Sequence, residues 1–225
     1  MVLVRLVLTG LVVAGSWQPA FAQEASGTFY LFGGAGLVHQ DGVTGETYVT
    51  YVTAPGDNTL GWTVGAGVFA APAISIEGEF SSTGMMTARE PLRNDFTYTV
   101  ERRDRFIGGN ARFHLGSASP IHLEPLVGLA LIRHEGWIQS ERHVFVPQER
   151  VDIDQRREQE LPESLGLTGG VDLHLGGEHF AVLPSFRLIT RLKSSTEGDF
   201  ELTSHYPGGF PRYTISGGVL ARVSF

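Results

Sequence analysis

The sequence has no cysteine and a single lysine, Lys193, among its 225 residues. Without cysteine, no disulfide can brace the fold in any redox compartment. No apolar run after residue 22 approaches the about 20 residues that a membrane-spanning helix needs, which excludes a helical membrane protein. The formal net charge of −7 argues against a nucleic-acid partner.

The N-terminal segment has the features of a cleavable secretory signal. Arg5 supplies the positive start, residues 6–15 form an apolar stretch, and Ala-Phe-Ala at 20–22 forms a small-x-small cleavage site. We therefore expect a signal peptide over 1–22, followed by one exported domain over 23–225.

The last strand candidate, residues 213–225, alternates in polarity. One set of alternate residues is apolar and runs from Tyr213 to Phe225, whereas the other set is mostly polar and includes Arg222. A strand of a membrane barrel alternates in this way, with apolar residues facing lipid and polar residues facing inward. A terminal phenylalanine at this position resembles the assembly signal of bacterial outer-membrane barrels. Phe225 is therefore the predicted assembly signal, and the barrel assembly machinery is the expected partner.

Eight strands are predicted, most of them close to the about 9–11 residues that a tilted strand needs to cross a bilayer. They cover residues 28–38, 59–70, 73–82, 104–115, 121–135, 163–175, 180–192 and 213–225. The connections alternate between short turns (71–72, 116–120, 176–179) and long loops (39–58, 83–103, 136–162, 193–212), as in outer-membrane barrels. The predicted fold class is all-β: an eight-stranded antiparallel up-and-down transmembrane β-barrel.

Three features carry a family resemblance: the opening Phe-Tyr-Leu-Phe-Gly-Gly at 29–34, the glycine-rich second strand, and the ending at Phe225. Together they resemble the small eight-stranded outer-membrane barrels, the family of OmpX, the opacity proteins and the membrane half of OmpA. The resemblance covers the whole mature chain. It implies a monomer in the outer membrane of a Gram-negative bacterium, in contact with lipid and lipopolysaccharide. It also implies a non-enzymatic role without cofactor, in adhesion, serum resistance or envelope support.

Alternation along the strands places eight charged side chains inside the barrel. They are Glu77, Glu79, Glu124, Asp172, Arg112, Arg187, Arg191 and Arg222. The interior of an eight-stranded barrel is just wide enough for side chains to fill, and an unpaired charge there costs several kcal/mol. We therefore predict a structural network of ion pairs that seals the lumen, with a narrow gated channel as the alternative. The register of the first strand stays open, because residues 29–32 are apolar on both faces.

Four histidines lie at or near the short-turn ends of the predicted strands: His114, His122, His174 and His179. With Glu124 and Asp172 they could bind zinc or copper. No HxH or HxxxH spacing supports a metal site, and interior histidines readily serve as hydrogen-bond partners of acids. No metal ligand is therefore assigned.

A lipid-modifying enzyme is the rival class. Barrels that hydrolyse lipid need a serine and a histidine together on the lipid side, with an acid behind them. No histidine falls on an outward position of the strands whose register is clear. Ser204 and His205 are adjacent, so they point apart on an extended chain, and no GxSxG motif occurs. No catalytic residue is predicted.

The long loops contain segments rich in β-branched and aromatic residues, at 45–53, 95–101 and 143–153. One interpretation is a raised sheet beyond the membrane, with an edge open to a strand of an extracellular protein partner; the other is ordinary hairpins. The charges at 101–105 and 156–158 favour a solvated rim of mixed sign over contact with lipopolysaccharide phosphates. The predicted function is surface interaction or envelope structure through the outer loops.

Overall fold

The structure, a computed structural model, describes residues 28–40, 43–46, 51–54, 58–93, 96–116, 119–146, 149–160, 163–192 and 212–225. The predicted signal segment 1–22 and the pair Ser204–His205 lie outside these ranges. Every regular element within them is a β-strand. The described residues contain no helix long and apolar enough to cross a bilayer.

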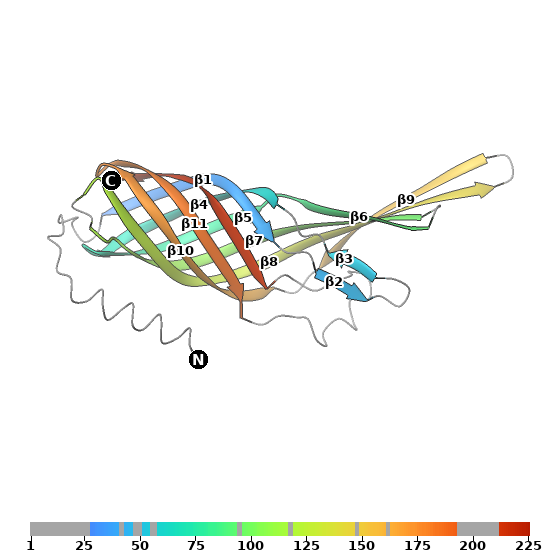
Figure 1. Ribbon diagram of the computed structural model, residues 1–225, viewed down its shortest axis with the longest axis horizontal. Helices are drawn as coiled ribbons and strands as arrows, with labels where there is room; N and C mark the ends of the chain where they lie inside the picture. The colour runs from blue at the N-terminus through green and yellow to red at the C-terminus, as the bar shows by residue number, and fades with distance from the viewer. Residues whose placement is uncertain are drawn as a thin grey trace.

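Eight antiparallel strands close a barrel (Figure 1). They are β1 (Phe29–Gln40), β4 (Asn58–Ala71), β5 (Ile74–Thr83), β7 (Phe96–Phe113), β8 (Ile121–Val146), β10 (Ser164–Gly176), β11 (Phe180–Arg191) and β12 (Tyr213–Ser224). Each pairs with the next, and β1 closes the ring by pairing with both β4 and β12. The predicted all-β, eight-stranded up-and-down barrel is confirmed.

The start of β1 and the end of β12 lie at the same mouth of the barrel, here termed the turn end. The ring of Phe29, at the start of β1, stacks on that of Phe225 with centroids 6.3 Å apart. The Phe225 amide also donates to the Phe29 carbonyl oxygen at 2.9 Å. The connections β4–β5, β7–β8 and β10–β11 turn at this same mouth, as the predicted alternation of short and long connections requires.

The outward face of the wall is an exposed apolar belt. Its most exposed members include Leu31, Leu37, Leu60, Trp62, Val64, Ile76, Ile107, Leu123, Val127, Leu129, Leu165, Phe186 and Val219. Exposed apolar surface on this scale marks a site of contact with lipid or with another protein. A ring of it around a closed barrel is the lipid-facing band of a membrane barrel.

The register that the sequence left open, that of β1, places Tyr30 and Phe32 inside the barrel, 0% and 5% exposed. Glycines of β4 make room for these rings. A Cβ atom added at Gly67 would lie 2.3 Å from Tyr30 Cζ, and one at Gly65 would lie 2.2 Å from Phe32 Cζ. The glycine-rich second strand is therefore the complement of the aromatic first strand.

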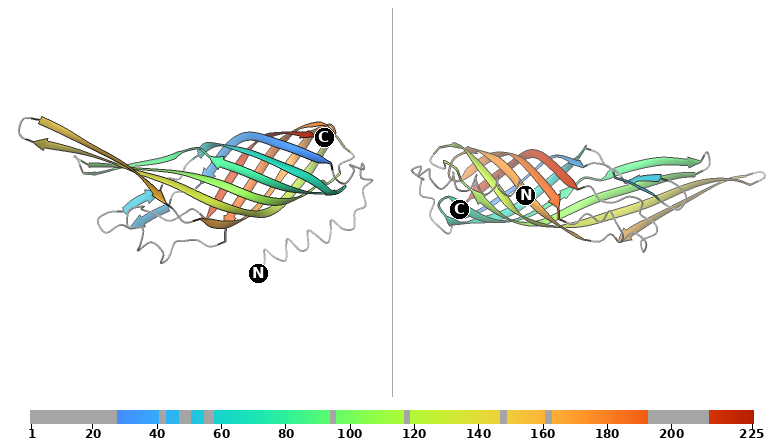
Figure 2. Two further views of the ribbon diagram at one scale, coloured as in Figure 1. Left: turned by 180° about the vertical axis from the view of Figure 1, so that it is seen from behind. Right: turned by 60° about the horizontal axis from the view of Figure 1, so that its bottom comes forward.

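Strands β7 and β8 continue far beyond the belt, away from the turn end. Their ladder is unbroken from the pair Arg112–Leu126 to the pair Phe96–Arg142. Strand β6 (Met86–Arg93) pairs with β7, and β9 (Glu149–Glu160) pairs with β8. The result is a four-stranded sheet, β6-β7-β8-β9, termed the raised sheet (Figures 1 and 2). The interpretation as continuing strands is confirmed for the described residues of 95–101 and 143–153.

The third β-prone segment, 45–53, does not join the raised sheet among the described strands. Strands β2 (Val43–Glu46) and β3 (Tyr51–Ala54) pair with each other as a separate hairpin, and residues 47–50 lie outside the described ranges. The prediction of one sheet from all three segments was wrong. The hairpin connects β1 to β4, whereas the raised sheet grows from β7 and β8 elsewhere on the rim.

The raised sheet should behave as a paired sheet in hydrogen exchange. In protein folded in lipid nanodiscs, we expect the amides of residues 97–102 and 136–141 to exchange slowly, because the ladder holds them. Substitution Val100→Pro removes one donor and bends the strand, so protection should fall around residue 100 but persist in β1 and β12. Val100→Ala is the matched control. Exchange of the wild-type amides at the rate of a free peptide would contradict the raised sheet.

Candidate functional site

A layer of buried charges crosses the lumen next to the turn end. This lower charge layer consists of Glu77, Arg112, Glu124, Asp172, Arg187 and Arg222, which are 0–6% exposed. They come from β5, β7, β8, β10, β11 and β12, on the alternate positions that face inward. Three carboxylates face three guanidinium groups, so the layer is balanced.

Arg112 lies at the centre of this layer and contacts all three carboxylates. Its Nε donates to Glu77 Oε1 at 2.7 Å. Its Nη1 donates to Glu124 Oε2 at 2.9 Å and to Asp172 Oδ2 at 2.5 Å. One guanidinium group thus joins strands on opposite sides of the interior.

The other two arginines hold one carboxylate each by paired hydrogen bonds. Arg222 donates from Nη1 and Nη2 to the two oxygens of Glu124, both at 2.9 Å. Arg187 donates from Nη1 to Asp172 Oδ1 and from Nη2 to Asp172 Oδ2, the latter at 2.9 Å. The planar guanidinium fork matches the two oxygens of a carboxylate, which makes these pairs strong and directional.

The aromatic residues of β1 pack against the lower charge layer. The Tyr30 hydroxyl donates to Glu77 Oε1 at 2.6 Å. The Arg222 guanidinium lies 5.2 Å from the Tyr30 ring centre, and that of Arg112 lies 5.8 Å from the Phe32 ring centre. A cation over an aromatic face is stabilised by the ring, and the stabilisation is largest where water is excluded. Sequence reasoning missed this role of Tyr30.

A second cluster of buried polar side chains is centred on Asp104 and fills the lumen at the opposite end of the apolar belt. It is termed the outer cluster. The Asp104 carboxylate accepts from Gln40 Nε2 at 2.8 Å and from Arg191 Nη2 at 3.1 Å. His134 Nδ1 lies 2.7 Å from the same carboxylate. Arg102 Nη2 donates to Gln40 Oε1 at 2.8 Å. Arg191, which the sequence grouped with the other inward charges, thus belongs to a separate cluster.

The assignment of Arg102 and Asp104 to a solvated rim was wrong, because both side chains are fully buried. Alternation along β7 continues past the belt, so these two residues face inward. Their neighbours Arg103 and Arg105 face outward, where both contact Glu135, at 2.5 and 2.9 Å. The mixed-sign rim therefore exists, but only on the outward positions.

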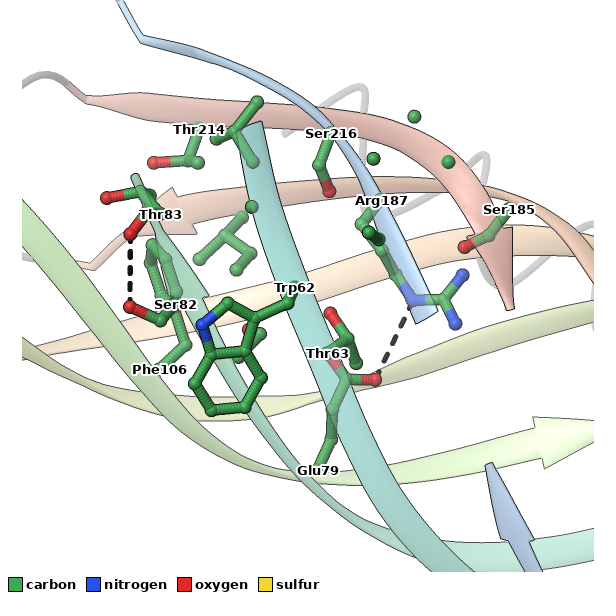
Figure 3. Close-up of a pocket in the computed structure, with 18 of the residues that line it drawn as sticks. Trp62, Thr63, Glu79, Ser82, Thr83, Phe106, Ser185, Arg187, Thr214 and Ser216 are labelled. Atoms are coloured by element: carbon green, nitrogen blue, oxygen red, sulfur yellow. Dashed lines mark hydrogen bonds and ion pairs between the residues drawn. The ribbon is translucent and has the colours of Figure 1, made fainter. Parts of the chain in front are cut away.

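A small cavity of about 50 Å³ lies between the lower charge layer and the outer cluster (Figure 3). Its polar lining includes Thr63, Glu79, Ser185, Arg187, Thr214 and Ser216. Glu79 Oε2 lies 3.8 Å from Arg187 Nε, which is too far for a direct hydrogen bond. The rest of the lining is mostly apolar. Beside the polar groups, a space of this size holds about one or two water molecules, which can bridge them.

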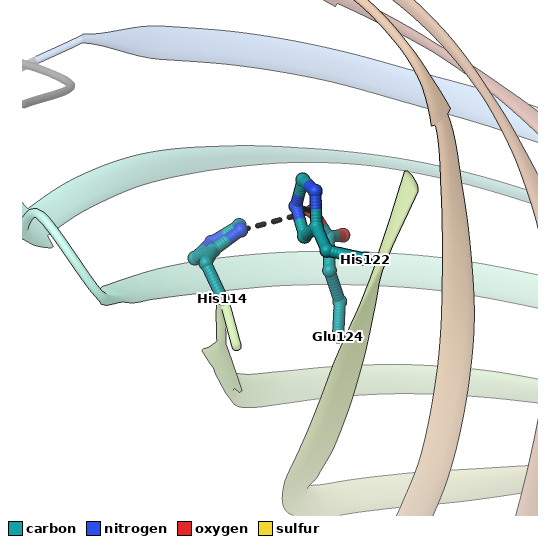
Figure 4. Close-up of side chains that lie close together, drawn as sticks. All are labelled: His114, His122 and Glu124. Carbon is teal, nitrogen blue, oxygen red and sulfur yellow. Dashed lines mark hydrogen bonds and ion pairs between the residues drawn. The ribbon is translucent and has the colours of Figure 1, made fainter. Parts of the chain in front are cut away.

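Three of the predicted histidines meet at the turn-end side of the lower charge layer. Figure 4 shows two of them, His114 and His122, beside Glu124. His114 Nδ1, His122 Nε2 and His174 Nδ1 lie 2.9, 3.1 and 3.3 Å from the single oxygen Oε1 of Glu124. The fourth, His179, is exposed in the β10–β11 turn and is not part of this group. Histidine and carboxylate donors in this arrangement have the chemistry of a transition-metal site.

The outward face of the raised sheet carries paired charges around one tryptophan. The Trp137 ring lies under two guanidinium groups, 5.6 Å from that of Arg103 and 5.9 Å from that of Arg156. Arg156 Nη2 also contacts Glu101 Oε2 at 2.5 Å. Arg103 and Arg156 each already have a carboxylate partner. The arrangement therefore does not favour the binding of an anion at this face.

One histidine faces outward at the end of β1, the strand whose register the sequence left open. His39, at the outer end of β1, alternates with the outward-facing Leu37, and its Nδ1 lies 3.0 Å from Asn58 Oδ1. Its register neighbours are Ile215 on β12 and Asn58 on β4, neither of which is a nucleophile.

No protein-family model matches the chain, and no curated protein matches its sequence. Similar solved structures include the outer membrane protein OprG from Pseudomonas aeruginosa, with a TM-score of 0.50 and 10% identity over 88% of this chain and 96% of that one. Neisserial surface protein A gives a TM-score of 0.46 and 12% identity over 88% and 97%. Ail, the attachment invasion locus protein of Yersinia pestis, gives 0.41 and 9% over 89% and 99%. At such identities the likeness shows the fold alone.

The protein is a membrane-spanning β-barrel. This class is defined by the closed strand topology, the apolar belt and the polar interior. Its fold is that of the small eight-stranded outer-membrane barrels of Gram-negative bacteria, which confirms the resemblance found in the sequence.

Loss of the central arginine should destabilise the barrel. In Arg112→Met, Glu124 and Asp172 keep their other arginines, but Glu77 keeps only the Tyr30 hydroxyl. A buried carboxylate without its cation costs about 3–5 kcal/mol in free energy of unfolding. Urea unfolding in lipid vesicles measures the loss.

Two variants test the cause of that loss. The exposed pair Arg133–Glu163 supplies the control, because Arg133→Met should cost less than about 1 kcal/mol. Adding Glu77→Gln to Arg112→Met should recover part of the stability, since the stranded charge is gone. A cost below about 1 kcal/mol for Arg112→Met would mean that water already solvates the layer.

Proposed function

We propose that the barrel is a closed anchor whose raised sheet binds a folded protein outside the cell. The observation that supports this most is the unbroken β7–β8 ladder, which runs from the membrane-spanning wall into the raised sheet. A sheet that continues the wall is held rigid, and rigid presentation lowers the entropy cost of binding. Envelope support by the barrel alone would not require such an extension.

The face of the raised sheet suits a partner better than its edges do. Among the described strands, the free edges are β6 and β9. Strand β6 contains Pro91 and a register irregularity next to it, and the sequence of β9 is mostly charged. Proline, bulges and charge are the devices that prevent strand addition at a sheet edge. We therefore replace the edge expected from the sequence by the outward face.

Trp137 is the centre of that face. Tryptophan and arginine are the residues that most often dominate the energy of protein–protein interfaces. Here Arg103 and Arg156 hold the Trp137 ring between them, so the ring is ordered before a partner arrives. The surrounding ion pairs of both signs favour a protein surface of mixed charge over a polyanion.

We also propose that the protein is a monomer. It is surrounded by lipid and lipopolysaccharide, and the barrel assembly machinery inserts it into the membrane. The Phe225 side chain is 69% exposed at the rim of the turn end, where such machinery can reach the final strand. The proposal assigns the protein no catalytic activity.

Binding should depend on the outward face and not on the barrel. Cells of a non-adherent bacterial strain that display the protein should bind a subset of immobilised extracellular-matrix and serum proteins. Trp137→Ala should weaken this binding about tenfold or more, as loss of an interface hot spot does. Surface display, measured with an antibody to an epitope tag, must be equal for all variants.

Arg133→Ala is the matched control, because Arg133 is an exposed arginine with its own partner, Glu163, but lies away from Trp137. Its binding should equal that of the wild type. Wild-type binding by Trp137→Ala, or equal losses in both variants, would contradict the assignment of this face.

A further inference from the structure

Three imidazoles surround one carboxylate oxygen just inside the turn end. His114 follows β7, His122 and Glu124 lie on β8, and His174 lies on β10 opposite His122 in the ladder. The rings of His122 and His174 stack with centroids 4.2 Å apart. Every contact of a hydrogen-bond network pairs a donor with an acceptor, and one contact of this group, that between His122 and Glu124, does not do so when the imidazole is neutral.

His122 shows the mismatch most clearly. Its Nδ1 lies 2.8 Å from the Ser119 carbonyl oxygen, which can only accept, so Nδ1 carries the hydrogen. In a neutral imidazole, Nε2 then presents a lone pair. That lone pair faces Glu124 Oε1 at 3.1 Å, so two acceptors confront each other. A cation between them resolves the conflict.

His174 does not share this conflict. Its Nδ1 lies 2.5 Å from Arg222 Nη2, and a guanidinium nitrogen can only donate, so the Nδ1 lone pair accepts from Arg222. Arg222 Nη2 also donates to Glu124 Oε1 at 2.9 Å. The point left unresolved is therefore the contact between His122 Nε2 and Glu124 Oε1.

We propose that this point is a binding site for a divalent transition metal, with zinc as the ion that fits the ligand set. The ligands are His114 Nδ1, His122 Nε2 and Glu124 Oε1, which lie within 4.8 Å of one another. Zinc binds histidine nitrogen and carboxylate oxygen at about 2.0–2.2 Å, so small side-chain rotations bring the three atoms into reach. The fourth position goes to water, because the lone pair of His174 Nδ1 already accepts from Arg222.

The surroundings orient the ligands as metal sites require. Glu124 Oε2 is held by Arg112 and Arg222, at 2.9 Å each. Oε1 also accepts from Arg222 Nη2 at 2.9 Å, and on metal binding the ion would replace this one contact while the two bonds at Oε2 still hold the carboxylate. His122 is fixed through its other nitrogen by the Ser119 carbonyl, and His114 through Nε2 by Ser75 Oγ at 2.9 Å. Such outer partners fix the ring orientation and tune ligand strength.

The metal can enter from the turn end. His122 and His174 are 9% and 5% exposed, whereas Glu124 behind them is fully buried. Ser119, beside His122, is exposed in the turn. The site therefore opens to the compartment that contains the short turns, opposite the raised sheet, and does not depend on the proposed binding face.

Metal titration of the folded protein in detergent tests the site. After removal of metals with a chelator, Co²⁺ should give the visible absorption of a four-coordinate ion, and Zn²⁺ should displace it. Calorimetry should find one Zn²⁺ per chain. His122→Gln and His114→Gln should each weaken Zn²⁺ binding by at least about tenfold, the scale of losses at metal sites.

His179→Gln is the control, because this nearby histidine is exposed and outside the group; its affinity should equal that of the wild type. Zn²⁺ should also raise the unfolding temperature of the wild type but not that of His122→Gln, provided that this variant migrates as a folded barrel on unheated gels. If His122→Gln does not fold, His114→Gln serves as the ligand variant in this measurement.

Three results would overturn the proposal. They are no saturable binding by the wild type, unchanged binding in the ligand variants, and an equal loss in His179→Gln, which would indicate a surface site. Proton uptake without zinc binding would show that the resolving cation is a proton on His122.

Discussion

A closed eight-stranded wall leaves no room for bulk water, so each inward charge must find its counterion across the interior. The lower charge layer meets this constraint with three arginines against three carboxylates. Arg112 is the group that makes this work, because it alone contacts all three acids. The register of the strands, the aromatic packing of Tyr30 and Phe32, and closure of the lumen are all tied to this one arrangement.

The outer cluster repeats the solution at the other end of the belt with different residues. There the Asp104 carboxylate contacts Gln40, His134 and Arg191. Because Asp104 lies on β7, where the wall becomes the raised sheet, the cluster also fixes the base of that sheet. The buried charges thus stabilise the membrane-spanning wall and position the surface that we propose for binding.

Much of the wall could be predicted from the sequence. The segment predicted at 73–82 is β5 (Ile74–Thr83), because its apolar and polar residues alternate cleanly and a tight turn precedes it. The predicted segment 104–115 missed the first half of β7 (Phe96–Phe113). Residues 101–105 are charged on both faces, so polarity no longer distinguishes inside from outside, although alternation of direction continues.

Other features depend on contacts between distant strands and could not be read from one strand. The apolar stretch at 29–32 gives no indication of which rings point inward, since the deciding partners are Gly65 and Gly67 on β4. Similarly, the sequence identified inward arginines but not which acid each one holds. The histidines around Glu124 show no HxH or HxxxH spacing because they come from β8, β10 and the end of β7.

The central claim, that paired charges close the lumen, is tested most directly by current recordings across planar bilayers. The wild-type barrel should give no steady conductance. The double variant Glu77→Ala and Arg112→Ala removes one charge of each sign, keeps the layer neutral and opens space at its centre, so it should conduct if it inserts. Steady wild-type currents as large as those of the double variant would contradict the account.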